Sequence, residues 1–163
     1  MTIDAQSIRD VVQPFVPGWV VMPKQVSFNG HDMLWYNSSN AAISTGFSAD
    51  FDVVRQADAA SANNGDYAVI GVILAPGTYT LRHYTNKASG ACKYDVYVDG
   101  VLVSSSPIDQ YAAVAASAAM ADVTFTITGG GYHVFKFLVN GKNASSGDYY
   151  LYMGKCAIVP SVY

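Results

Sequence analysis

Residues 129–160 read GGGYHVFKFLVNGKNASSGDYYLYMGKCAIVP, and this stretch decides the fold predicted for the chain. It joins a glycine turn, an alternating strand, a polar loop of small residues and a second strand. This order predicts the closing hairpin of a compact β-sandwich, with an exposed loop between two apolar strands. Because loops on such a scaffold usually carry the contacts with a partner, this loop is the first candidate site.

The strand pattern continues upstream of this stretch. Residues 123–128 (VTFTIT) alternate apolar side chains with threonines, and residues 92–98 (CKYDVYV) precede Asp99-Gly100, a strong signal for a tight hairpin. Residues 67–74 (YAVIGVIL) form a nearly continuous apolar run, which predicts a strand buried on both faces. Short strands at regular spacing with frequent turns indicate an all-β sandwich or barrel.

Composition agrees with an all-β domain and narrows the possible partners. The 163 residues favour one domain, and the net charge of −3 without a basic cluster argues against nucleic acid or an anionic membrane as partner. No apolar run approaches the roughly 20 residues that span a bilayer. All 12 acidic residues are Asp. The absence of Glu, a strong helix former, favours strands and removes glutamate as a general acid or base.

Three further segments lie outside this regular series of strands. Residues 2–13 could form a short helix that Pro14 and Pro17 end, and the segment is expected to dock on a partner as an arm. Residues 19–26 could form an edge strand. In residues 106–121 (SPIDQYAAVAASAAMA), the local pattern favours a helix, because a capping box precedes a run of alanines.

Four blocks of sequence follow one another from about residue 66 onward: LAPGTYTL (74–81), YDVYVDGV (94–101), IDQY (108–111), and GYH (131–133) with GKNASSGDYY (141–150). Together they resemble the galactose-binding-like jelly-roll modules of phage tail fibres, tailspikes and other virion proteins, which are related to carbohydrate-binding modules. The resemblance implies an antiparallel jelly-roll β-sandwich over residues 41–163. It also implies an extended segment at 106–121, and leaves residues 1–40 as an attachment arm and first strand.

A sugar site would stack a pyranose ring on an aromatic side chain and hold its hydroxyls with polar groups. The chain offers such side chains in the predicted loop and near Trp35. The candidate contact residues are Lys142, Asn143, Ser145, Ser146, Asp148, Tyr149, Tyr150, Trp35 and Tyr36. The alternative is structural: successive tyrosines on a strand face opposite sides, and loop Asn and Ser side chains often bond only to their own turn.

The sequence gives little support for a catalytic site or a metal site. The nearest carboxylate pairs are Asp50 with Asp52 and Asp95 with Asp99, which are ordinary positions at strand ends and turns. No G-x-S-x-G elbow and no D-x-D-x-D-G calcium loop is present, so no catalytic residue, metal or cofactor is predicted. His83 and His133 are expected to point into the core. Two remote cysteines, Cys92 and Cys156, are expected to be buried thiols, with a disulfide as the alternative.

The resemblance therefore predicts a non-enzymatic structural protein on the surface of a phage particle. The first expectation is a capsid decoration (cement) protein that forms a homo-oligomer, preferably a trimer, and contacts other virion proteins such as the major capsid protein. The first alternative is a tail fibre or receptor-binding tip that recognises a host glycan. The second alternative is a carbohydrate-binding module.

Overall fold

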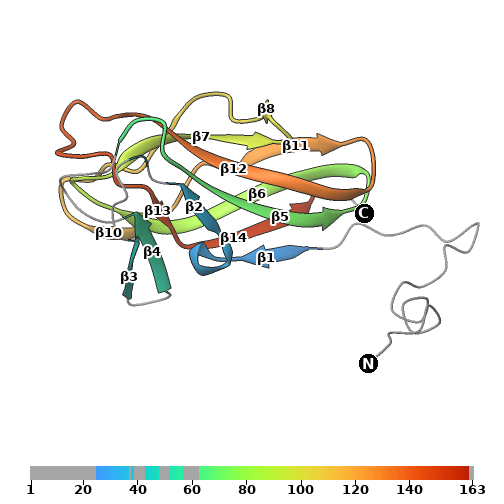
Figure 1. Cartoon of the computed structure of the whole chain (residues 1–163), viewed down its shortest axis with the longest axis horizontal. Coiled ribbons are helices and arrows are strands. Elements are labelled where there is room, and N and C mark those ends of the chain that lie inside the picture. The colour runs from blue at the N-terminus through green and yellow to red at the C-terminus, as the bar shows by residue number, and fades with distance from the viewer. Residues whose placement is uncertain (1–24, 37, 39–42, 48–51, 57–62, 162–163) are drawn as a thin grey trace, which may run out of the picture.

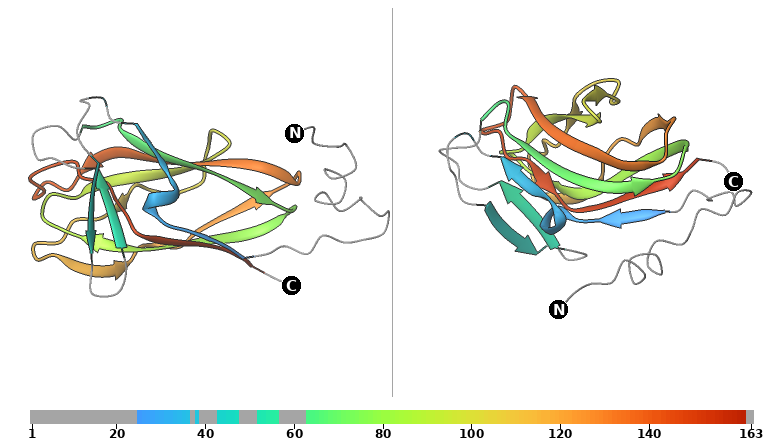
Figure 2. Two further views of the ribbon diagram at one scale, coloured as in Figure 1. Left: turned by 60° about the horizontal axis from the view of Figure 1, so that its bottom comes forward. Right: turned by 45° about the vertical axis from the view of Figure 1, so that its right-hand side comes forward.

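The computed structural model describes residues 25–36, 38, 43–47, 52–56 and 63–161. Two antiparallel sheets pack face to face, and a small third sheet stands beside them (Figures 1 and 2). The predicted all-β, antiparallel jelly-roll β-sandwich is therefore confirmed. The only helix in the described residues is the 3-10 turn η1 (Gly30–Asp32), and none there is long and apolar enough to cross a membrane.

The two large sheets share the strands almost equally. The five-stranded sheet has the order β1-β14-β6-β10, with β11 also paired to β6, and the six-stranded sheet has the order β2-β5-β12-β7-β8, with β9 also paired to β7. The strands of the five-stranded sheet are β1 (Val26–Phe28), β6 (Gly77–Lys87), β10 (Ala116–Ala119), β11 (Val123–Ile127) and β14 (Lys155–Pro160). Those of the six-stranded sheet are β2 (Leu34–Tyr36), β5 (Tyr67–Leu74), β7 (Cys92–Val98), β8 (Val101–Leu102), β9 (Ile108–Asp109) and β12 (Gly131–Lys142). The third sheet is formed by β3 (Ile43–Phe47), β4 (Asp52–Gln56) and β13 (Tyr152–Met153).

The core lies between the two large sheets and follows from the period-two pattern of their strands. In β11, Val123, Phe125 and Ile127 are buried while the threonines between them are exposed. In β12, Phe135 and Phe137 are fully buried on the opposite sheet. Alternate side chains of a strand point to opposite faces, so each strand supplies one apolar row to the interior.

The predicted hairpin at Asp99-Gly100 joins β7 to β8. Asp99 has a φ of 49° and Gly100 a φ of 82°. Two successive left-handed residues form a two-residue turn whose twist matches the flanking strands, and Asp and Gly tolerate that conformation best. Val98 is consequently paired with Val101, as the sequence predicts.

The hairpin predicted for residues 129–160 is wrong, although both of its strands exist. β12 lies in the six-stranded sheet between β5 and β7, while β14 lies in the five-stranded sheet between β1 and β6. The segment between them therefore crosses from one layer to the other and contributes β13 to the third sheet. Strand alternation is a local property, whereas sheet membership depends on distant partners such as β6.

The double-sided burial predicted for β5 is also wrong. Ala68, Val72 and Leu74 face the core, but Ile73 is 76% exposed. No described element covers the outer face of the six-stranded sheet. An apolar run alone therefore did not distinguish a strand between two layers from a strand with an open apolar face.

Several smaller expectations have clear outcomes. Residues 106–121 are extended and include β9 and β10, so the conformation implied by the resemblance is confirmed and the locally favoured helix is not formed. Cys92 and Cys156 are buried free thiols. Within the predicted attachment arm and first strand at residues 1–40, residues 25–36 supply β1 and β2 to the two large sheets, and residues 1–24 lie outside the described residues.

Candidate functional site

The predicted loop at 142–150 is bonded into one end of the sandwich (orange-red loop, left in Figure 1). Ser146 is buried, and its hydroxyl donates to the carbonyl oxygen of Ala91 at 2.8 Å. The backbone N–H of Gly147 donates to the carbonyl oxygen of Ser89 at 2.9 Å. These bonds tie the loop to the connection between β6 and β7, so Ser146 supports the loop from within.

Tyr150 also packs inside this end of the molecule. A Cβ atom on Gly90 would lie 2.8 Å from the ring of Tyr150, so glycine is the residue that leaves room for the ring. The ring makes an edge contact with Tyr152 at 6.4 Å between centroids. Its burial agrees with the structural alternative for these tyrosines, in which one of them points inward.

The remaining loop residues bond mainly to one another. The amide nitrogen Nδ2 of Asn143 donates to Asp109 at 2.8 Å, and its Oδ1 accepts the backbone N–H of Ser145 at 3.0 Å. The Lys142 ammonium lies 4.8 Å from the ring centroid of Tyr149. Asp148 accepts the backbone N–H of Tyr149 at 3.0 Å. This loop end is a half-exposed polar surface whose hydrogen-bonding groups are largely used internally.

Trp35 and Tyr36 point to opposite faces of β2. The indole N–H of Trp35 donates to the carbonyl oxygen of Gly30 at 3.1 Å, and its ring packs against the core. Tyr36 is 50% exposed and stacks on Tyr67, with ring centroids 4.8 Å apart and an interplanar angle of 15°. Trp35 is thus a packing residue, whereas Tyr36 belongs to an exposed aromatic surface.

This surface, here named the tyrosine face, covers the outer side of the six-stranded sheet. Its members are Tyr36 of β2, Tyr67 of β5, Tyr97 of β7, and Tyr132 and Lys136 of β12. Strand pairing brings them together, because Tyr36 is opposite Tyr67 and Lys136 is opposite Tyr97. The ammonium of Lys136 lies 4.2 Å above the ring of Tyr67 and forms no ion pair with a described carboxylate.

Tyr132 is the most exposed ring of the tyrosine face. A Cβ atom on Gly71 would lie 1.8 Å from its hydroxyl oxygen, so the phenol end of the ring covers the glycine on the neighbouring strand. Tyr132 nevertheless remains 70% exposed. The ring therefore leans across β5 and offers an aromatic surface to solvent.

A hollow of about 360 Å³ lies beside these rings on the same face. Its lining is formed by Val69, Tyr97, Gly100, Val134, Lys136 and Leu138. Most of the lining is apolar, and among the described residues that form it Lys136 supplies the only charged group. A shallow, mainly apolar hollow with one ammonium group suits a ligand that has both apolar faces and polar edges.

Of the tyrosine face, sequence reasoning named only Tyr36. The signal for the others was present in the run YAVIGVIL, because an isolated glycine inside a strand often marks the close approach of another group. Gly71 has that role, with Tyr132 as the approaching group. The sequence alone does not say which residue approaches, since the two are 61 positions apart and meet only through strand pairing.

The candidate acids and bases serve structural roles where they are described. Asp95 is buried and accepts the amide of Asn140 at 2.6 Å. Asp99 accepts the imidazole Nδ1 of His133 at 2.7 Å and the backbone N–H of Val134 at 2.8 Å, and these bonds hold the pKa of its carboxyl below the usual value. The pair Asp50 and Asp52 lies outside the described side chains.

Of the two histidines expected in the core, one is fully enclosed there and the other lies at its margin. His83 is buried in the core, as predicted, with its Nδ1 2.7 Å from the hydroxyl of Tyr94. His133 lies on the same face of β12 as the buried Phe135 and Phe137, but near the start of the strand beside the turn between β7 and β8, where its side chain keeps 12% exposure and bonds to Asp99. Within the residues that the structure describes, no group of three or more His, Cys or Asp side chains is placed to hold a metal ion.

Neither protein-family models nor curated protein sequences match this chain. Solved structures do match its fold. A xanthan lyase from Paenibacillus aligns with a TM-score of 0.63 at 18% identity over 83% of this chain, which corresponds to 13% of the lyase chain. A carbohydrate-binding module of family CBM36, solved with calcium and xylotriose, aligns with a TM-score of 0.56 at 17% identity, covering 82% of this chain and 98% of the module.

A third similar structure is a family 35 carbohydrate-binding module from Clostridium thermocellum, with a TM-score of 0.54 and 16% identity. The alignment covers 85% of this chain and 99% of that module. The chain thus spans nearly the whole of two isolated modules but only a small part of the lyase. These similarities establish that the chain has the jelly-roll β-sandwich fold of carbohydrate-binding modules.

Proposed function

We propose that this chain is a non-catalytic glycan-binding module and that its tyrosine face receives the saccharide. The carrying observation is Tyr132, which is 70% exposed although its phenol end covers Gly71. Sugar rings bind proteins by placing their C–H faces on aromatic rings and their hydroxyls on polar groups. The fold shared with carbohydrate-binding modules supports the same function.

The chemistry of the face also favours a saccharide. Four tyrosine hydroxyls and the Lys136 ammonium provide hydrogen-bonding groups at the edges of aromatic and aliphatic side chains. Successive side chains on one face of a strand are roughly 7 Å apart, so Tyr132, Val134, Lys136 and Leu138 of β12 form a line of contacts. An extended glycan lying along β12 would meet these contacts in turn.

We expect Tyr132→Ala to weaken polysaccharide binding at least about tenfold, because an exposed aromatic anchor contributes more than 1 kcal/mol to such contacts. The matched control is Tyr84→Ala, which removes an exposed tyrosine from the opposite sheet. Affinity electrophoresis with xylan, laminarin, galactan and xanthan would identify a ligand, and calorimetry would give the affinities. The proposal fails if the chain binds no glycan on a broad array, or if both variants bind as the parent does.

A structural role on a phage particle stays a prediction, and one observation favours it as the second candidate. Seven large apolar side chains are exposed on the six-stranded sheet: Leu34, Tyr36, Ile73, Val101, Leu102, Tyr132 and Val134. Apolar surface of this kind often marks contact with another protein. Self-association into a trimer would cover part of it, and such an assembly could attach to a particle through its capsid or tail proteins.

Light scattering coupled to size-exclusion chromatography tests this second candidate. We expect the chain to elute with three times the mass of one chain, and Ile73→Lys to shift it to a monomer, since a buried unpaired charge opposes association. Thr126→Lys, which places the same charge on the outer face of the other sheet, should leave the trimer intact. A monomer at high protein concentration would remove self-association from consideration.

A further inference from the structure

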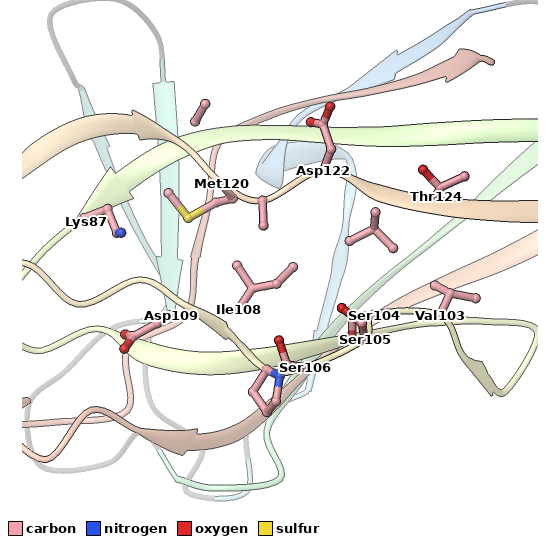
Figure 3. A pocket seen from close by; sticks show the side chains of 14 residues that line it. Lys87, Val103, Ser104, Ser105, Ser106, Ile108, Asp109, Met120, Asp122 and Thr124 are labelled. Carbon is pink, nitrogen blue, oxygen red and sulfur yellow. The ribbon is translucent and has the colours of Figure 1, made fainter.

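A second cavity, here named the edge pocket (Figure 3), has none of the residues of the tyrosine face or its hollow in its described lining. Its volume is about 530 Å³. One wall is formed by residues 103–109, which follow β8 and include β9, and the other by residues 119–124 at the junction of β10 and β11. Lys87, the last residue of β6, lies at one end. The pocket therefore lies where an edge of each large sheet leaves the core accessible.

The edge pocket has an apolar floor and a polar rim. Ile108, Met120 and Val123, which are core residues with 5 to 8% exposure, reach it from the interior. Around them Figure 3 shows the side chains of Ser104, Ser105 and Ser106 on one side, with Lys87 and Asp109 toward the other end. The polar groups thus encircle the apolar centre.

Much of the hydrogen-bonding capacity of this rim is unused within the described residues. The hydroxyls of Ser105 and Ser106 and the ammonium of Lys87 have no hydrogen-bond or ion-pair partner there. Ser104 is buried and accepts the backbone N–H of Val96 at 3.1 Å, which leaves its own proton available to a ligand. A hydroxyl both donates and accepts, so the rim can bond to groups of either kind.

Asp109 gives the rim a fixed acceptor. Its Oδ1 accepts the backbone N–H of Tyr111 at 2.9 Å, and its Oδ2 accepts Asn143 at 2.8 Å. Lys93 lies 3.9 Å from the same Oδ2. The carboxylate is therefore held in place from three sides, and each of its oxygens can accept a further bond from the pocket. One end of the pocket thereby contacts the predicted loop through Asn143.

From this arrangement we infer that the edge pocket binds a single neutral saccharide unit, such as the terminal residue of a glycan. A pyranose ring has apolar C–H faces and a periphery of hydroxyls that donate and accept, which matches an apolar floor with a mixed rim. The volume falls within the range of small-molecule sites. The inference shares only its ligand class with the tyrosine face, because no residue is common to the two sites.

Methyl NMR of the full chain tests the inference directly. The ε-methyl group of Met120, assigned through Met120→Leu, should shift saturably when a methyl glycoside of glucose, galactose, mannose or xylose is added at millimolar concentration. The methyl groups of Met33 and Met153, which are buried elsewhere in the core and do not line the pocket, should not shift. Failure of all four glycosides to shift Met120 would overturn the inference.

Two variants test whether the serines of the rim hold the saccharide that shifts the Met120 methyl signal. Replacing both exposed serines, Ser105→Ala with Ser106→Ala, should weaken binding at least about tenfold, since each lost hydrogen bond contributes about fivefold. Ser27→Ala, on β1 at the edge of the five-stranded sheet opposite to β10, should leave the titration unchanged. Equal affinity for the double variant and the parent chain would contradict a saccharide held by this rim.

Tyr132→Ala separates this inference from the proposed function. The substitution should leave the Met120 titration unchanged while it weakens binding to polysaccharide. Polysaccharide binding without any Met120 shift would overturn the edge-pocket inference and leave the tyrosine face in place. A Met120 titration in a chain that binds no polysaccharide would support the edge pocket and contradict the tyrosine face.

Discussion

Acidification from pH 6.5 to about pH 4.5 should lower the free energy of unfolding by about 2 kcal/mol through His83 alone. Burial lowers the pKa of this imidazole from 6.5 to about 3. In the unfolded chain the same side chain takes up a proton near pH 6.5. Between these two values the unfolded state binds more protons than the folded state, so the stability that neutral His83 contributes is lost as the pH falls.

The contacts of His83 explain why the folded protein resists the proton. The backbone N–H of Gly154 donates to Nε2 at 3.3 Å, so Nε2 must be the acceptor and Nδ1 carries the hydrogen. Nδ1 then donates to the hydroxyl of Tyr94 at 2.7 Å. A second proton on Nε2 would face the Gly154 N–H, in an interior where a charge is poorly solvated.

Urea denaturation at a series of pH values measures the effect. His83→Gln should have a lower free energy of unfolding than the parent chain at neutral pH. That free energy should also fall less steeply as the pH is lowered, because the contribution of His83 is gone. His31→Gln, which changes an exposed histidine, should retain the slope of the parent chain. Asp99 does not interfere, because its pKa is lowered and it titrates below this window. An unchanged slope in the His83 variant would contradict the assignment.

Gln110→Leu should lower the free energy of unfolding by at least about 2 kcal/mol, because it removes two buried hydrogen bonds. The side chain of Gln110 is fully buried, and its Nε2 donates to the carbonyl oxygen of Tyr152 at 2.7 Å. Its Oε1 accepts the backbone N–H of the same residue at 3.1 Å. The amide thus pairs with the Tyr152 backbone as a neighbouring strand would.

Gln110 also holds the loop end of the sandwich together through the hydrogen bonds of its backbone. Its backbone N–H donates to Cys92 at 3.0 Å, and its carbonyl oxygen accepts Ala88 at 3.1 Å. Gln110 therefore bonds to three segments at the loop end of the sandwich: the connection between β6 and β7, the start of β7, and β13. Chemical denaturation of Gln110→Leu measures the effect, and Gln25→Leu, an exposed glutamine, should change stability by less than about 0.5 kcal/mol. Similar midpoints for the two variants would refute the role.

The two polar core contacts illustrate what sequence reasoning missed. Gln110 belonged to the block IDQY that carried the family resemblance, but its partner Tyr152 is 42 residues away. The expectation for His83 was a satisfied core histidine, which is confirmed, yet neither Tyr94 nor Gly154 was identified as its partner. Such pairs depend on which strands face each other across the core, and no local pattern encodes that.

For the candidate loop, too, the sequence predicted the position of the residues but not their burial. Its residues were located correctly at the end of β12, but Ser146 and Tyr150 turned out to be buried supports of the loop. The exposed tyrosines on the six-stranded sheet were largely overlooked, because β5 was expected to be covered on both sides. Exposure of a face depends on whether another layer packs on it, which is a property of the whole fold.

The run from residue 129 to 160 determined, by itself, where two strands and a polar loop would form, since alternation and turn residues act over a few positions. The Asp99-Gly100 turn and the five-residue alternation of β11 with its threonines are similarly local outcomes. Only the tertiary structure assigned β12 and β14 to different sheets, left one sheet face open and opened a pocket at the edge. These features arise from pairings between distant strands, and their free energy depends on neighbours that a local pattern does not specify.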